Sequence, residues 1–180
     1  MIILIGGAGC VGKTLLAQRL LERYKFPYLS LDHLKMGIIR SGADCGFTAE
    51  SRDELISKKL WPIVRGIIMT AVENRQNLIV EGSYVPANWR ESFTQEYLSD
   101  IRLVCLVMTE EYIRTHVMDI ARYAGVIEDR VDDGWWTADR LVQENERFQK
   151  DFATEYCHII EDAYHVDPRV IFRRVEELDP

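Results

Sequence analysis

The eight residues from Gly7 to Thr14, GAGCVGKT, have the spacing G-x-x-x-x-G-K-[ST]. Glycine at Gly7, Gly9 and Gly12 lets the backbone turn its N–H groups inward around an anion. The lysine can reach the β- and γ-phosphates of a nucleoside triphosphate, and the threonine hydroxyl can bind Mg²⁺. The spacing therefore predicts a phosphate-binding loop made by Gly7, Ala8, Gly9, Cys10, Val11, Gly12, Lys13 and Thr14.

Two carboxylates follow short apolar runs, Asp32 after Tyr28–Leu31 and Glu81 after Leu78–Val80. In phosphoryl transfer one carboxylate orients the acceptor hydroxyl and takes its proton, and we expect Asp32 in that catalytic role. The alternative for Asp32 is an N-cap of the helix that follows it. Glu81 is expected to hold Mg²⁺ with Thr14, and its alternative is an ordinary turn acid before a glycine.

Arginines are frequent between residues 109 and 150, at positions 114, 122, 130, 140 and 147. An arginine on a closing segment can stabilise the transition-state charge of a transferring phosphoryl group. Arg122 is the first candidate, because it precedes a glycine-containing stretch, and Arg130 is the second. We therefore expect a lid within residues 122–140; the alternative is that these arginines only solvate exposed helix faces.

The elements that must position these groups alternate between strands and helices. Ile2–Ile5 reads as a strand and Leu15–Glu22 as a helix. Thr109 and Thr137 are expected N-caps, and Pro62 is expected to kink or divide a helix that starts near Ser51. Further strands are predicted at Tyr28–Leu31, Leu78–Val80, Ile101–Val107 and His158–Ile160. A helix is expected to end at Gly125, and a closing helix is expected at Pro168–Leu178.

Such alternation predicts a parallel sheet covered by helices on both faces. Ligands of parallel sheets bind at the carboxyl ends of the strands. The glycine-rich loop, Asp32 and Glu81 all follow predicted strands, so they are expected to meet in one crevice.

Size and composition favour one ordinary globular domain over residues 1–180, with 47% hydrophobic and 28% charged residues. The formal net charge of −7 disfavours nucleic acid as a partner. The four cysteines lack disulfide or zinc spacing, which predicts free thiols in a reducing cytoplasm. No apolar run approaches membrane length, so no membrane partner is expected.

With these residues together, the chain resembles the small P-loop kinases, the nucleotide, shikimate and gluconate kinase group, with zeta-toxin and chloramphenicol phosphotransferase relatives. The resemblance is carried by Gly7–Thr14, by Leu29–Asp32 and by the stretch Glu110–Arg122. It implies a three-layer α/β sandwich of the P-loop NTPase fold, with five parallel strands in the order 2-3-1-4-5. It also implies transfer of the ATP γ-phosphoryl group to a hydroxyl of a small molecule or nucleotide.

The chain departs from these families in two motifs. It has no adenylate-kinase-type acceptor signature and no Arg-x-Arg lid motif, so the acceptor stays open. The guanine-reading N-K-x-D motif is absent too, which favours ATP over GTP. Two alternatives remain: an ATP-binding regulatory switch with weak hydrolysis, and a zeta-toxin-like kinase of a sugar nucleotide.

Overall fold

A computed structural model describes residues 1–124 and 137–161 of the chain. Its strands are β1 (Ile2–Gly7), β2 (Tyr28–Ser30), β3 (Leu78–Glu81), β4 (Ile101–Met108) and β5 (Cys157–Ile160). Its helices are α1 (Lys13–Tyr24), α2 (Leu31–Arg40), α3 (Asp53–Glu73), α4 (Gln95–Leu98), α5 (Glu110–Tyr123) and α6 (Ala138–Asp151). Two short 3₁₀ helices, η1 (Trp89–Ser92) and η2 (Thr154–Tyr156), lie before α4 and β5.

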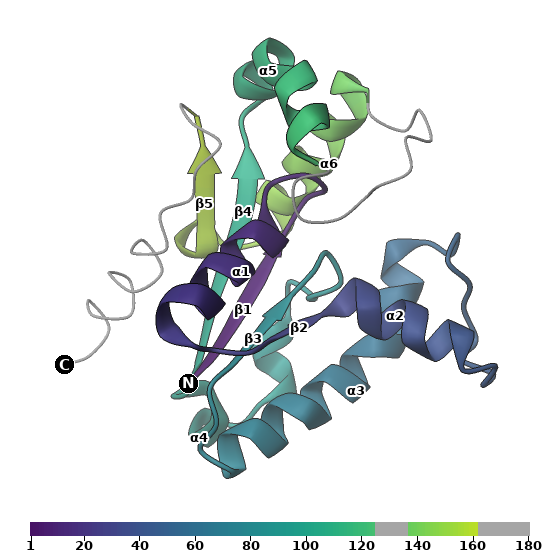
Figure 1. Cartoon of the computed structure of the whole chain (residues 1–180), viewed down its shortest axis with the longest axis vertical. Helices are drawn as coiled ribbons and strands as arrows, with labels where there is room; N and C mark the ends of the chain where they lie inside the picture. Colours follow the sequence, from purple (N-terminus) through teal and green to yellow (C-terminus); the bar gives the residue numbers. More distant parts are fainter. Residues whose placement is uncertain (125–136, 162–180) are drawn as a thin grey trace.

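The five strands form one parallel sheet in the order β2-β3-β1-β4-β5, which confirms the predicted order. β1 lies at the centre and all six of its residues are buried, because β3 and β4 flank it and helices cover both faces. α1 lies over one face, in front of β1 in Figure 1, whereas α3 and α6 pack on the other. The three-layer P-loop NTPase fold is thereby established.

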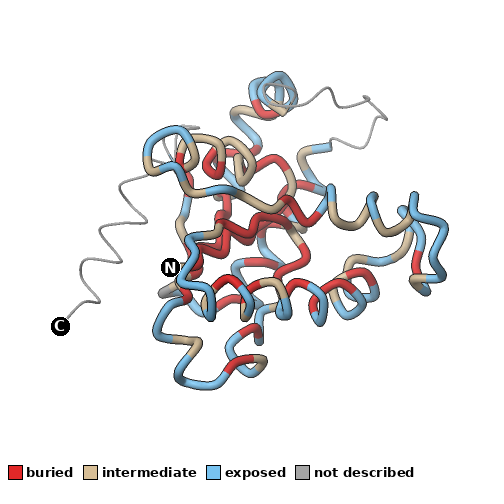
Figure 2. The backbone as a smooth tube through the Cα atoms, turned by 60° about the horizontal axis from the view of Figure 1, so that its bottom comes forward, coloured by how far each residue is buried: buried red, intermediate tan, exposed pale blue. Residues whose placement is uncertain are grey.

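Buried residues concentrate along the strands and on the inward helix faces, whereas the outer turns are exposed (Figure 2). Leu16, Ala17 and Leu20 give α1 its buried stripe. In α3 the buried stripe includes Leu60, Trp61 and Val64. No helix of the described residues is long and apolar enough to cross a membrane.

Two predicted N-caps are confirmed. The Thr109 hydroxyl accepts a hydrogen bond from the Tyr112 amide at 3.1 Å and starts α5. The Thr137 hydroxyl accepts one from the Arg140 amide at 3.4 Å and starts α6. Each cap satisfies a backbone donor that the first helical turn leaves without a partner.

A buried asparagine fixes α6 to the end of β4. The Asn145 Oδ1 accepts from the Met108 amide at 2.7 Å, and its Nδ2 donates to the Leu141 carbonyl at 2.7 Å. Only 2% of Asn145 is exposed, so both ends of its amide depend on these partners. The contact sets how far α6 lies from the carboxyl end of the sheet.

α3 is one helix through Pro62, so of the two expectations the division into two helices is wrong, and the kink stays a prediction. Proline removes one hydrogen bond to the carbonyl four residues earlier, here that of Lys58. Lys58 and Pro62 both lie on the exposed side, where water can satisfy that carbonyl. Buried Leu60, Trp61 and Val64 hold the two flanking turns against the core.

Some expectations fall outside the described residues. These are the helix end at Gly125, the arginine Arg130 with most of the expected lid, and the closing helix at Pro168–Leu178. They stay predictions.

Candidate functional site

The loop between β1 and α1 has the backbone geometry that the glycine-rich motif predicts. Gly7, Cys10 and Gly12 have positive φ values of 131°, 57° and 85°. Gly12 is the N-cap of α1 and provides no side-chain cap, and the first turn of α1 contains no acid. The first N–H groups of α1 and its positive dipole end are therefore available to an anion.

Gly7 and Gly12 differ in what a side chain would meet, and they form a matched pair of test sites. A Cβ on Gly7 would lie 2.2 Å from the Leu106 carbonyl oxygen, whereas a Cβ on Gly12 would meet nothing within 4 Å. Gly12→Ala is expected to cost about 1–2 kcal/mol from backbone strain alone. Gly7→Ala should add an overpacking cost of about 1–3 kcal/mol. Urea unfolding of both variants measures the difference, and equal losses would contradict the clash.

The two residues expected to hold Mg²⁺ lie side by side. The Thr14 hydroxyl, at the start of α1, donates to Glu81 Oε2 at 3.4 Å. Lys13 lies at the same point, and its ammonium donates to the Ala8 carbonyl within the loop. The structure therefore brings together Lys13, Thr14 and Glu81, as the sequence predicts.

Glu81 is a buried carboxylate at the end of β3, with 2% of its surface exposed. Burial raises its pKa above the ordinary value, although Lys13 and hydrogen bonds from Ser30 and Thr14 oppose the shift. Because the pKa of Glu81 is higher in the folded chain, its contribution to the free energy of unfolding is greatest in acid. This contribution is lost as the pH rises through the raised pKa. At neutral pH the raised pKa of Glu81 therefore lowers the free energy of unfolding, because the carboxyl ionises less readily in the folded chain than in the unfolded one.

Glu81→Gln is expected to unfold at higher urea concentration than the parent at pH 7–8, because glutamine keeps the shape and removes the buried charge. This advantage should shrink toward about pH 4, where the parent carboxyl becomes protonated in both states. Urea titrations across that range check it. Glu96→Gln, on exposed α4, is the control and should show no comparable trend; a pH-independent gain for Glu81→Gln would contradict the pKa argument.

Asp32 is the second residue of α2, whose N-cap is Ser30, so the N-cap alternative for Asp32 is wrong. Its side chain is 52% exposed, and its Oδ1 lies 3.1 Å from the Lys35 ammonium. Ser30, the last residue of β2, pairs with Glu81 of β3 in the sheet, so Asp32 follows β2 at the edge where Glu81 lies. The predicted meeting of the strand ends is confirmed for these groups.

Lys35 and Tyr84 form a hydrogen-bonded cluster with Asp32, and the sequence analysis missed both. The Lys35 ammonium donates to the Tyr84 hydroxyl at 2.8 Å as well as to Asp32. Burial alone would lower the pKa of Lys35, but the bonds to Tyr84 and Asp32 outweigh it and raise the pKa. Lys35 therefore remains charged and fixes Asp32. The spacing of Asp32 and Lys35, three residues apart on a helix, is the one local signal for this pair.

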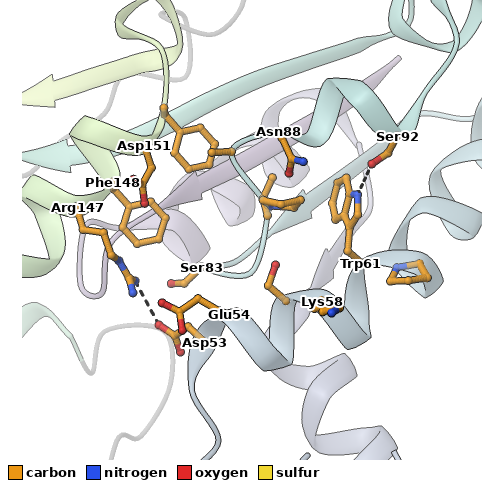
Figure 3. Close-up of a pocket in the computed structure, with 16 residues that line it drawn as sticks. Asp53, Glu54, Lys58, Trp61, Ser83, Asn88, Ser92, Arg147, Phe148 and Asp151 are labelled. Carbon is orange, nitrogen blue, oxygen red and sulfur yellow. Dashed lines mark hydrogen bonds and ion pairs between the residues drawn. The ribbon is translucent and has the colours of Figure 1, made fainter. Parts of the chain in front are cut away.

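Two adjoining hollows lie beside the loop, on the sheet face covered by α3 and α6. The first, of about 460 Å³, lies between α3, α6 and the segment after β3 (Figure 3). The second, of about 540 Å³, lies between the start of α3 and α6. Asp53, Glu54 and Arg147 line both, so we treat them as one cleft.

The cleft borders the phosphate-binding loop at two places. The Ser83 hydroxyl, on the wall of the first hollow, donates to the Gly7 carbonyl at 3.2 Å. A Cβ on Gly9 would lie 3.1 Å from a carboxylate oxygen of Glu144, which lines the second hollow. A molecule in the cleft therefore lies next to a phosphate bound by the loop.

The arginines divide between the cleft and the outer surface. Arg140 and Arg147 of α6 line the cleft, and the Arg147 guanidinium lies 3.3 Å from an Asp53 carboxylate oxygen. Arg122 lies exposed in the last turn of α5, and neither hollow includes it among its lining residues in the described parts of the chain. Arg114 pairs with Glu110 and Asp139. The structure thus favours Arg140 and Arg147 as the arginines near the site.

The donor set at Thr14 and Glu81 fits a magnesium ion. Mg²⁺ prefers oxygen ligands and is commonly held by one or two protein oxygens together with substrate phosphates. Across residues 1–124 and 137–161, no group of three histidine, cysteine or acidic side chains could hold a metal by itself. A metal site here would therefore need the phosphates as partners.

Comparisons with known proteins support the fold. No protein-family profile matches the chain, and no curated protein matches it in sequence. Among solved structures, a gluconokinase from Sinorhizobium meliloti 1021 matches with a TM-score of 0.51 and 15% identity, over 95% of this chain and 86% of that one. A protein from Chloroflexus aurantiacus j-10-fl, described provisionally as a kinase, matches with a TM-score of 0.54 and 17% identity, over 98% and 96%. The chain has the fold of these proteins.

Proposed function

We propose that this protein is an ATP- and Mg²⁺-dependent kinase that phosphorylates a hydroxyl group of a small molecule. The observation that carries the proposal is the start of α1, which is free of a side-chain cap and of acids and lies beside the Thr14–Glu81 pair. The fold that the chain shares with a gluconokinase supports the same reading. The adjoining cleft offers space for an acceptor.

In the proposed reaction the acceptor hydroxyl oxygen attacks the γ-phosphorus of ATP. The new O–P bond forms as the bond to the bridging β–γ oxygen breaks, and ADP leaves. The acceptor proton passes to a carboxylate, and Asp32 is the proposed base. Lys35 binds the Asp32 carboxylate, and the bond from Lys35 to the Tyr84 hydroxyl holds the ammonium in place.

The loop amides and Lys13 would bind the phosphates, with the Lys13 ammonium exchanging the Ala8 carbonyl for a phosphate oxygen. Thr14 and Glu81 would hold Mg²⁺, which neutralises phosphate charge when bound. Arg140 and Arg147 would face the transferring group from α6. The lid role of Arg122 and Arg130 stays a proposal, and Arg130 lies outside the described residues.

The regulatory-switch alternative is not favoured. A switch that has no acceptor needs no second site, and side chains would fill the space beside the loop. The structure instead leaves a cleft there, bordered by Ser83 and Glu144. A toxin-like kinase is a narrower form of the same proposal, and growth arrest that Lys13→Ala relieves would identify it.

Two measurements test the proposed function. Calorimetry should detect binding of Mg·ATP, with weaker binding when EDTA removes the metal. ADP release should then increase when the correct hydroxylated compound is added from a panel of sugars, nucleosides and other metabolites. Absence of Mg·ATP binding would refute the proposal, and a slow hydrolysis rate that no compound changes would favour the switch.

A further inference from the structure

The walls of the cleft change from apolar to polar along its length. Trp61 of α3 and Phe148 and Phe152 at the end of α6 line the first hollow, together with Val85 and Pro86. Among residues 1–124 and 137–161, the second hollow is lined by charged and amide side chains of α3, α6 and Arg52. The apolar part therefore suits a flat hydrophobic group, and the polar part borders the phosphate-binding loop through Glu144.

The apolar hollow contains more carboxylates than cations. Asp53, Glu54 and Asp151 line it, whereas Lys58 and Arg147 are the lysine and arginine among its lining residues. Arg147 is already bound to Asp53 at 3.3 Å, and its guanidinium lies 5.1 Å over the Phe148 ring. Figure 3 shows Arg147, Asp53 and Glu54 on one side of this hollow and Trp61 on the other.

An acidic acceptor would meet poor partners in this hollow. Among the described lining residues its carboxylate or phosphate would find one cation without an ion pair, Lys58. It would otherwise have to displace Asp53 from Arg147, and it would approach both Glu54 and Asp151. In residues 1–124 and 137–161 neither of these two acids has an ion pair. An ammonium or hydroxyl group would instead find free carboxylate acceptors beside aromatic rings, an arrangement that attracts cations.

We infer that the acceptor is a neutral or cationic hydroxylated compound with a flat apolar ring, and that Glu54 and Asp151 discriminate against anionic acceptors. This inference rests on the proposed function, since it identifies the substrate class of the same site. The ring lies between Trp61 and Phe148, and the reacting hydroxyl points toward the loop.

A matched series of three compounds tests the charge preference. Phenyllactate, 3-phenyl-1,2-propanediol and phenylalaninol share a phenyl ring and a hydroxyl, and at neutral pH they carry one negative, no and one positive charge. Calorimetry in saturating Mg·AMP-PNP should give a dissociation constant for the anion that is about tenfold or more higher than that for the cation. Thymidine should likewise bind more tightly than its monophosphate. Gluconate, an anion without a ring, should bind weakest.

The double variant Glu54→Gln/Asp151→Asn should remove the preference, with the dissociation constant for the anion falling about tenfold relative to that for the cation. Glu146→Gln is the control, because this acid lies on α6 but is not among the lining residues of either hollow. Both acids are exposed, so the double variant is expected to fold. Urea unfolding checks this.

Three outcomes would overturn the inference: tightest binding of the anion, tighter binding of gluconate than of the ring compounds, or no binding of any compound while Mg·AMP-PNP binds. Loss of Mg·AMP-PNP binding would instead refute the proposed kinase function. In that case the same series, titrated without nucleotide, still measures the charge preference of the cleft. The two failures are therefore distinguishable.

Discussion

Lys13→Ala is expected to lower kcat/KM for phosphoryl transfer by about 10³-fold, because it removes the cation that offsets phosphate charge at the start of α1. The lysine lies within the loop, where its ammonium bonds to the Ala8 carbonyl and lies near Glu81. Loss of this charge should also weaken Mg·ATP binding. Steady-state kinetics with the identified acceptor, and calorimetry with Mg·ATP, measure both effects.

Lys59→Ala is the matched control for Lys13→Ala, since Lys59 is an exposed lysine of α3 outside both hollows. It should leave the kinetics unchanged. Retention of full activity by Lys13→Ala would rule out a role of the Lys13 ammonium in phosphate binding and transfer. Urea unfolding should show that both variants fold.

Asp32→Asn is expected to lower kcat by about 10²–10⁴-fold while the affinity for Mg·ATP stays nearly unchanged. Asparagine keeps the shape and the bond to Lys35 but cannot take the acceptor proton. The side chain is half exposed and lies in the first turn of α2, so the fold should tolerate the change. Single-turnover transfer and nucleotide calorimetry separate the two effects.

Asp100→Asn is the control for this variant, because Asp100 is exposed at the opposite, amino end of β4. If Asp32→Asn turns over at the parental rate, Asp32 is not the base. If it loses nucleotide affinity instead, the residue acts through the Glu81 and Thr14 cluster, and a role in metal binding replaces the role in proton transfer.

Local sequence patterns were sufficient to locate the strands and the phosphate-binding loop, whereas the order of the strands in the sheet was implied by the family resemblance. Each strand is a short apolar run followed by a break, and the glycine-rich motif requires a strand before it and a helix after it. Thr109 and Thr137 act as caps through bonds to residues three positions later, so a short stretch of sequence contains both partners of each bond. The first residue of α2 could not be predicted from such a short stretch. Leu31 is fully buried and begins the helix one residue before Asp32.

The cleft could not be predicted, because its walls come from three distant segments. Trp61, Ser83 and Phe148 each occupy an ordinary position in their own element, and only the packing of α3 and α6 on the sheet brings them together. The orientation of α6 depends on Asn145, whose partner Met108 is 37 residues away. A polar residue at a helical core position indicates a buried hydrogen bond, but the sequence does not identify the residue at its other end.

The place of β1 in the sheet has a consequence for synthesis on the ribosome. This strand is entirely apolar or glycine, yet its partners are Leu78–Glu81 on one side and Ile101–Met108 on the other. Translation therefore leaves both edges of the strand unpaired until Leu78–Glu81 is made, and one edge unpaired until Ile101–Met108 follows, an interval in which nascent chains can aggregate. We expect production in cells to depend on chaperones that shield this segment until its neighbours arrive.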